Sequence, residues 1–418
     1  MKFHNYFFTA FSIFISFTLA GCPEDENLLN KGGPASGIAV VNSDYESTSI
    51  SLLNDDFTLA QSNCLSSGSQ TPELSQALSG DVVLASTPKN DKSELVLIDR
   101  SNSAIIWLNP VTCSVRAQLA VGTTGSGNFY ANPRDVLTLS TTKAYVTRFA
   151  QNASYNSEEP DVNDLERGDD ILIIDPSTPS IIGHIDLSEI IAAVDNASVL
   201  ARPAQLMLID NMVYLTLGRI SAFYDTAAPS ILIVIDSETD TITDSIELPF
   251  LDCEAMAYIN EAQNLIIACY GLYSDSQPQS ETAGIVAVDI SVSPPTIAKS
   301  YNYNIFANRT VSGMTVAAMD SDQIFVVVMG NGDDQNDEIW RLSLNNDKVA
   351  SVFTASGSWQ LSSLFADPTT KKLLATDGSM TDPKLRVFST SDAATCTEVN
   401  NLNPDPEHNL PPRQVIKY

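Results

Sequence analysis

Residues 132–149, NPRDVLTLSTTKAYVTRF, decide the fold because the chain repeats their pattern. An apolar segment, a tight polar turn and a second apolar segment with a tyrosine follow one another. Residues 202–219, RPAQLMLIDNMVYLTLGR, have the same form, and Tyr214 matches Tyr145 if the turn differs by one residue. β-branched residues, period-two alternation and Asp, Asn, Ser or Pro turns predict antiparallel strand pairs.

A second strand pair follows each such pair after a polar loop. Examples are DILIIDPSTPSIIGHIDL (170–187) and SILIVIDSETDTITDSIEL (230–248). The four-strand unit recurs about every 50 residues, a period typical of propeller blades, which close radially and hide their sheet edges. Complete units start near residues 80, 132, 202, 252, 310 and 358.

The two ends of the repeat region complement each other. Residues 37–61, GIAVVNSDYESTSISLLNDDFTLAQ, supply three strands of a further unit and lack the innermost one. The C-terminal PPRQVIKY (411–418) matches NPRDVLTL, an innermost strand, with Arg413 on Arg134. We therefore predict an all-β, seven-bladed β-propeller over residues 37–418, closed by the C-terminal strand in the first blade. A stray extended tail is the alternative.

At this point the chain resembles the YVTN-type seven-bladed propeller proteins. The resemblance is carried by KAYVTRF (143–149) and by the turns in IIDPST (173–178) and VIDSET (234–239), and it covers residues 37–418. Arg148 stands where the family usually has Asn. The resemblance implies the fold, whereas function has to be argued from the site because propellers host enzymes and binding modules alike.

The first 22 residues, MKFHNYFFTAFSIFISFTLAGC, indicate a targeting segment: a basic start, an apolar run, and small residues before a cysteine. The final LAGC resembles a bacterial lipobox, which implies cleavage before Cys22 and acylation of that residue; an ordinary secretory signal with a chance cysteine is the alternative. We predict a signal peptide at residues 1–21, a lipidated tether at 22–36 and a lipid bilayer as partner. By resemblance to enterobacterial sorting, Pro23 favours the outer membrane of the bacterial cell envelope.

The chain is strongly acidic, with a formal net charge of −29. Nucleic acid is excluded as a partner, because its binding needs clustered Lys and Arg to displace counterions. The charge suits a solvated surface, divalent cations or basic partners. We expect a monomer that binds a protein or small-ligand partner.

Cysteines and histidines limit the chemistry. Cys253 and Cys269 flank a predicted hairpin that turns near Glu261, so they lie opposite each other and predict a disulfide. The pairing of Cys64, Cys113 and Cys396 stays open.

The chain has three histidines, of which His4 lies in the signal, His184 in a predicted outermost strand and His408 near the C-terminus. A Ser-His-Asp set or a three-histidine zinc centre cannot be assembled from them.

Two candidate sites remain. Oxygen ligands at alternate positions, Asn331, Asp333, Gln335 and Asp337, predict a calcium site in a long loop; a solvated polar turn is the alternative.

Arg134, Arg202 and Arg413 are expected near the mouth of the central channel, where a cationic rim would bind a carboxylate or phosphate. Neutralisation of nearby acidic loops is the alternative.

The leading interpretation is a non-catalytic, membrane-anchored binding or scaffold lipoprotein that engages its partner through the loop-rich acidic face. One rival is a calcium-dependent, lactonase-like hydrolase that works in the central channel without histidine. Another is a quinoprotein-like redox subunit, for which no cofactor motif is present. Apart from possible calcium, no cofactor is predicted.

Overall fold

The computed structural model describes residues 32–86, 93–124, 127–155, 164–192, 198–273, 278–332, 334–392 and 395–418. The predicted signal peptide and Cys22 lie outside these residues.

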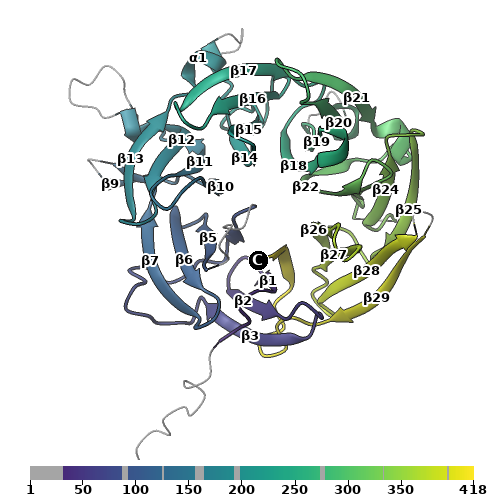
Figure 1. The fold of residues 1–418 in the computed structure, drawn as a ribbon, viewed down its shortest axis with the longest axis horizontal. Helices are drawn as coiled ribbons and strands as arrows, with labels where there is room; N and C mark the ends of the chain where they lie inside the picture. The colour runs from purple at the N-terminus through teal and green to yellow at the C-terminus, as the bar shows by residue number, and fades with distance from the viewer. Residues whose placement is uncertain are drawn as a thin grey trace, which may run out of the picture. The chain divides into compact units, whose positions relative to one another are not determined.

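Seven four-stranded antiparallel sheets form a ring (Figure 1), which confirms the predicted seven-bladed propeller. We number the blades along the chain and give the strands of each from the channel outward. Blade 1 is β30 (Pro412–Lys417), β1 (Ile38–Ser43), β2 (Thr48–Leu53) and β3 (Leu59–Ser66), and blade 2 is β4 (Val82–Leu84), β5 (Leu95–Asp99), β6 (Ala104–Asn109) and β7 (Ser114–Ala120). Blade 3 is β10 (Pro133–Thr138), β11 (Ala144–Gln151), β12 (Gly168–Asp175) and β13 (Ser180–Ile185), and blade 4 is β14 (Pro203–Ile209), β15 (Met212–Leu217), β16 (Ile231–Asp236) and β17 (Thr241–Glu247). Blade 5 is β18 (Cys253–Ile259), β19 (Asn264–Cys269), β20 (Gly284–Asp289) and β21 (Thr296–Asn302). Blade 6 is β22 (Val311–Asp320), β23 (Gln323–Val328), β24 (Glu338–Ser343) and β25 (Lys348–Thr354), and blade 7 is β26 (Leu361–Asp367), β27 (Lys372–Asp377), β28 (Lys384–Asp392) and β29 (Thr395–Leu402).

The remaining elements are short. A two-stranded hairpin, β8 (Thr123–Thr124) with β9 (Gly127–Asn128), follows blade 2. The α-helices in the described segments are α1 (Ser188–Ala192) and α2 (Gln279–Thr282). No helix within the described ranges is both long and apolar enough to cross a membrane.

The C-terminal strand closes the ring as predicted. β30 pairs antiparallel with β1, with Val415 opposite Val40. Tyr418 and Gly37 exchange two backbone hydrogen bonds of 2.8 and 3.0 Å, which extend the pairing past the end of β30. The first blade therefore has no unpaired inner edge.

The core lies between neighbouring blades. Strands β2 and β23 are buried along their whole length, whereas the outermost β17 alternates between exposed and partly buried residues. Inner strands are covered on both faces by the adjacent blades and so read as continuous apolar runs, while an outermost strand faces water on one side.

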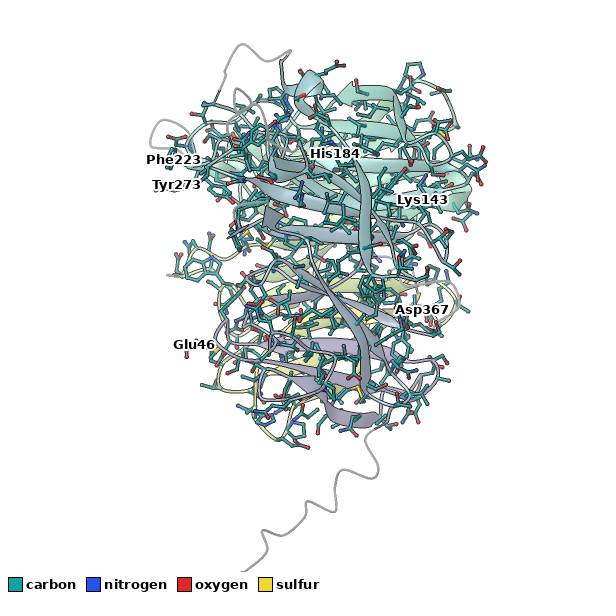
Figure 2. All side chains as sticks on the ribbon, turned by 90° about the vertical axis from the view of Figure 1, so that its left-hand side faces the viewer. Glu46, Lys143, His184, Phe223, Tyr273 and Asp367 are labelled. Atoms are coloured by element: carbon teal, nitrogen blue, oxygen red, sulfur yellow. A yellow bond between two sulfur atoms is a disulfide. The ribbon has the colours of Figure 1, made fainter. Side chains whose placement is uncertain are left out.

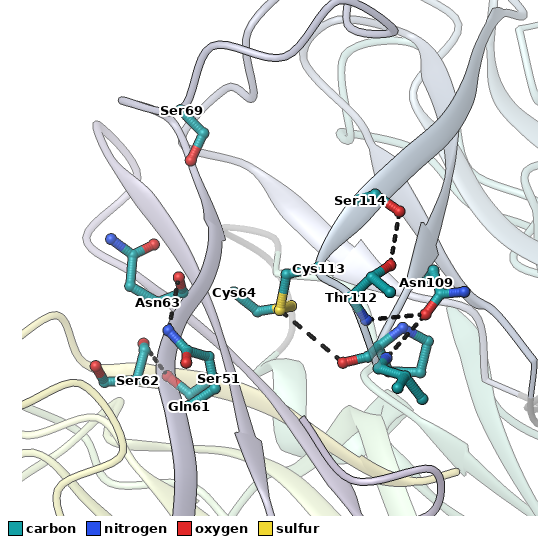
Figure 3. The surroundings of a disulfide bond; sticks show 12 residues. Ser51, Gln61, Ser62, Asn63, Cys64, Ser69, Asn109, Thr112, Cys113 and Ser114 are labelled. Atoms are coloured by element: carbon teal, nitrogen blue, oxygen red, sulfur yellow. Dashed lines mark hydrogen bonds between the residues drawn. A yellow bond between two sulfur atoms is a disulfide. The ribbon is translucent and has the colours of Figure 1, made fainter. Parts of the chain in front are cut away.

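Two disulfides lie within the described part of the chain. Cys253 and Cys269 are opposite each other in the β18–β19 pair and are bridged, as predicted. Cys64 of β3 is bridged to Cys113, in the turn before β7, so this bond joins blade 1 to blade 2 (Figure 3). Cys396 is the free cysteine among the described residues.

Candidate functional site

One face of the ring collects the features that could bind a ligand. The innermost strands begin there, and the loops between second and third strands emerge there, as the strand order predicts. Figure 2 shows the two faces: Glu46, Phe223 and Tyr273 lie on this side, and Lys143 and Asp367 lie on the opposite side. We call the first side the mouth face.

A β-bulge at the start of the innermost strand aims side chains into the channel. In β10, Pro133 pairs with Arg148 and Val136 with Val146, so Arg134 and Asp135 together face one residue of β11. Register shifts also occur in β14, β18, β22, β26 and β30. A bulge bends its strand and re-aims a side chain. These bulges were not predicted from the sequence, although adjacent polar residues such as Arg134-Asp135 interrupt the period-two pattern.

Threonine hydroxyls satisfy the bulged backbone and join the blades. The N–H of Asp135 donates to Thr147 Oγ1 at 2.9 Å, and this hydroxyl donates to the carbonyl of Ala204 in blade 4 at 2.9 Å. Thr216 makes the equivalent bond to the carbonyl of Glu254 in blade 5, at 2.7 Å. The channel wall is thus fixed by bonds that run from blade to blade.

In blades 3 and 4 the second residue of the bulge accepts a hydrogen bond from the backbone of the next blade. Asp135 accepts a 2.8 Å hydrogen bond from the N–H of Leu206, and Gln205 accepts one from Met256. Burial raises the pKa of Asp135 to about 6, although hydrogen bonds from Ser86, Leu206 and Val136 favour its charged form. These side chains are committed to holding the ring together.

A cavity of about 180 Å³ opens between the bulges. All seven innermost strands contribute to its wall. Two of the three predicted arginines, Arg134 and Arg413, line it, and Arg100 lines it as well. Arg100 is paired with Asp81 at 2.8 Å. Three guanidinium groups thus share the cavity wall with the carboxylates of Asp81, Asp135 and Glu254.

Arg134 is held in the cavity without a full set of partners. Its side chain is 17% exposed, and its guanidinium lies 4.2 Å from the ring centre of Phe149. Its ionic contact within the described ranges is Glu254, at 3.6 Å, and its buried Nε has no hydrogen-bond partner there. A buried donor without an acceptor costs about 1–3 kcal/mol.

Arg413 is better anchored. Its Nε donates to the carbonyl of Ser43 at 2.9 Å, and its guanidinium lies 4.8 Å from the ring centre of Tyr45. These contacts orient the side chain toward the same cavity as Arg134.

Arg202 lies elsewhere. It is 3% exposed, does not line the cavity, and donates to the carbonyls of Phe149 and Ser221. Arg202 directly precedes its strand in the left-handed conformation, with φ of 54°. Asn132 and Asp252 occupy the same position before their strands and share this conformation. Arg202 lies two residues before the bulge residue Ala204, and at this position its side chain turns away from the channel.

One predicted calcium ligand in the acidic loop of blade 6 has backbone partners in the next blade. Asp337 is buried and accepts backbone hydrogen bonds from Gly330, Gln360 and Leu361, so its carboxylate joins blade 6 to blade 7. Asp169 has the same role between blades 3 and 4.

Of the other predicted calcium ligands, Asn331 bonds the side chain of Asp334, Gln335 lies nearby in the loop, and Asp333 lies outside the described residues. Among described residues no group of three or more His, Cys, Asp or Glu could hold a metal ion. The calcium site stays a prediction.

Arg148, at the position where the resembled family usually has Asn, is a structural residue. It is buried, and its guanidinium forms a 2.7 Å ion pair with Asp170. His184, on the outermost strand β13 as predicted, contacts the same carboxylate at 3.0 Å.

Comparisons with known proteins show the fold alone. No family model matches the chain, and no curated protein matches it. A periplasmic gluconolactonase from Pseudomonas aeruginosa is 9% identical, with 91% of this chain and 98% of that chain covered and a TM-score of 0.55. A protein from Bacteroides uniformis, provisionally assigned as a 6-phosphogluconolactonase, is 10% identical, with 92% and 99% covered and a TM-score of 0.56. A Lactobacillus plantarum protein is 11% identical, with 92% and 99% covered and a TM-score of 0.55.

Proposed function

We propose that the protein is a monomeric, lipid-anchored binding protein of the bacterial cell envelope, most simply at the outer membrane. In this proposal acylated Cys22 holds it to a bilayer, and the channel mouth binds a small anionic ligand with a carboxylate or phosphate group. The function is binding, without catalysis.

The observation that carries the proposal is the state of Arg134. Its guanidinium is confined in the cavity, lies 3.6 Å from its carboxylate partner, and has a buried Nε without a partner among the described residues. A bound carboxylate or phosphate supplies the missing acceptors, because its oxygens match the guanidinium fork. Arg413 lines the same cavity and can contact the same anion.

Isothermal titration of the full-length protein with gluconate, citrate and inorganic phosphate tests the ligand class. We expect at least one probe to bind, and the double substitution Arg134→Gln, Arg413→Gln to weaken that binding at least tenfold. Arg116→Gln is the matched control. Arg116 lies on the outermost strand β7, does not line the channel cavity, and pairs with Glu94. Equal binding by the double variant, or binding of none of the probes, contradicts the proposal.

The membrane anchor has its own test. Metabolic labelling with a fatty acid should mark the wild-type protein and leave the Cys22→Ser variant unlabelled. An unlabelled wild-type protein would refute the anchor without affecting the ligand site.

A lactonase-like hydrolase is the second candidate. Its support is that the carboxylate of Glu254 and the guanidinium of Arg134 line one cavity, where they could act as general base and oxyanion stabiliser. Two proteins with a similar fold carry lactonase names. Hydrolysis of gluconolactone above the spontaneous rate, lost in Glu254→Gln, would favour this candidate; a Glu254→Gln variant as active as wild type would reject it.

A further inference from the structure

A second concave site lies on the mouth face, over blades 4 to 6. It is a groove of about 710 Å³, far larger than the channel cavity. Four aromatic side chains line it: Tyr224, Tyr270, Tyr273 and Trp359. Tyr273, which Figure 2 shows projecting from the mouth face, is 74% exposed, and Trp359 is 64% exposed. Large exposed rings on a groove wall are typical of recognition sites.

The backbone holds two of these rings in unfavourable conformations. Tyr224 and Trp359 have φ angles of 58° and 57°, in the left-handed region that bulky residues rarely adopt. The indole of Trp359 lies against Gly332, where a Cβ atom would come within 2.8 Å of the ring. Such conformations persist where surrounding structure imposes them, and they cluster at ligand sites.

The charges that line the groove favour a cation over an anion. Arg309 is the one cationic residue among the described lining residues, and its guanidinium already donates to Glu338 and to the carbonyls of Met329 and Asn336. It has little capacity left for an anionic ligand.

Asp252, unlike Arg309, has a polar atom without a partner. It is the one carboxylate among the described lining residues, and its Oδ1 atom is buried without a hydrogen-bond partner. Neither of the two nearby arginines donates a hydrogen bond to this atom: Arg134 has its ionic contact with Glu254, at 3.6 Å, and Arg202 donates to main-chain carbonyls. Asp252 Oδ1 is therefore an acceptor without a donor at the groove wall.

We propose that this groove binds an organic cation with an alkylammonium group, which the aromatic rings contact through their faces and the carboxylate of Asp252 neutralises. Aromatic rings attract such cations through their quadrupoles, most strongly where water is excluded. The net charge of −29 raises the local concentration of cations around the protein. None of the described residues that line this groove also lines the channel cavity, although the charges of Arg134 and Glu254 in the channel act on Asp252.

Ligand binding is coupled to the protonation of Asp252. Burial and the neighbouring Glu254 raise the pKa of Asp252 well above its usual range, while Arg134 and Arg202 oppose the rise. A cation beside the carboxylate favours its charged form, so binding releases a proton and the affinity increases with pH.

The test compares choline with 3,3-dimethyl-1-butanol, an uncharged molecule of nearly the same shape, by calorimetry on the full-length protein. We expect choline to bind at least tenfold more tightly. Asp252→Asn and Tyr273→Ala should each weaken choline binding at least threefold. Tyr130→Ala is the control and should change nothing, because Tyr130 is an exposed tyrosine that lies outside both concave sites.

Equal affinity for the two molecules overturns the proposal, because it removes the role of the charge. Absence of choline binding overturns it as well. Binding of an uncharged oligosaccharide such as maltoheptaose in place of choline would show that the rings stack on sugars, which also overturns it. Thermal melting of each variant separates loss of a contact from loss of the fold.

Discussion

Removal of residues 411–418 should destabilise the whole propeller rather than shorten one blade. Val415, Ile416 and Tyr418 are all buried. Burial of such side chains contributes roughly 1.5–3 kcal/mol each, or about 6 kcal/mol together. The deletion also leaves the edge of β1 unpaired. Because native proteins are stable by about 5–15 kcal/mol in total, the truncated chain should lose most of its stability.

Urea unfolding of the full-length and truncated proteins, followed by circular dichroism, measures the effect. Lys417→Gln is the control, because it removes a partly exposed ion pair with Asp367 and should cost no more than about 1 kcal/mol. The peptide PPRQVIKY, added separately, should restore part of the lost stability by pairing with β1. If the truncated protein unfolds at the same urea concentration as the full-length protein, the reasoning about ring closure is wrong.

Three further predictions concern the bonds within and between blades. Thr147→Val should cost about 2–3 kcal/mol in urea unfolding, because it leaves one donor and one acceptor of two blades unpaired, whereas Thr147→Ser should cost less. Double alanine substitution of Cys253 and Cys269 should cost about 3 kcal/mol of stability, the value expected for a disulfide between residues 16 apart. A reducing agent should lower the stability of the wild type toward that of the variant. Because the folded-state pKa of Asp135 is raised to about 6, its contribution to stability is present at low pH and is lost as pH rises from about 4 through 6. The wild type should therefore lose about 3 kcal/mol more than Asp135→Asn between pH 4 and 7, and parallel pH profiles would contradict the raised pKa.

The fold could be predicted because its determinants are local and repeated. Each blade carries its own strand alternation and turn residues. The pattern of one blade is weak evidence for a propeller, but its repetition along the chain identifies the fold. The closure was also predictable, since Arg413 and Val415 align with Arg134 and Val136 of a complete innermost strand. The Cys253–Cys269 bridge followed from a hairpin whose register the sequence shows.

The disulfide between Cys64 and Cys113 could not be predicted in the same way. Its two cysteines belong to different blades and are brought together by the packing of blade 1 on blade 2, which no local pattern records. The backbone contacts of Asp337 could not be predicted for a related reason: the N–H groups that its carboxylate accepts from belong to the next blade.

The candidate sites depend on two positions of the repeat that are separated by one residue, and this difference explains why Arg134 and Arg413 line the channel whereas Arg202 does not. The position just inside the innermost strand lies on a bulge and faces the channel, and Arg134, Glu254 and Arg413 occupy it. The position before the strand is left-handed, and it turns Arg202 into the protein and Asp252 to the groove. Backbone bonds fix both positions, so their side chains are free to vary from blade to blade. A ring of equivalent blades thus acquires a cavity lined by arginines and carboxylates, and a separate groove lined by aromatic rings and Asp252, without any change in its fold.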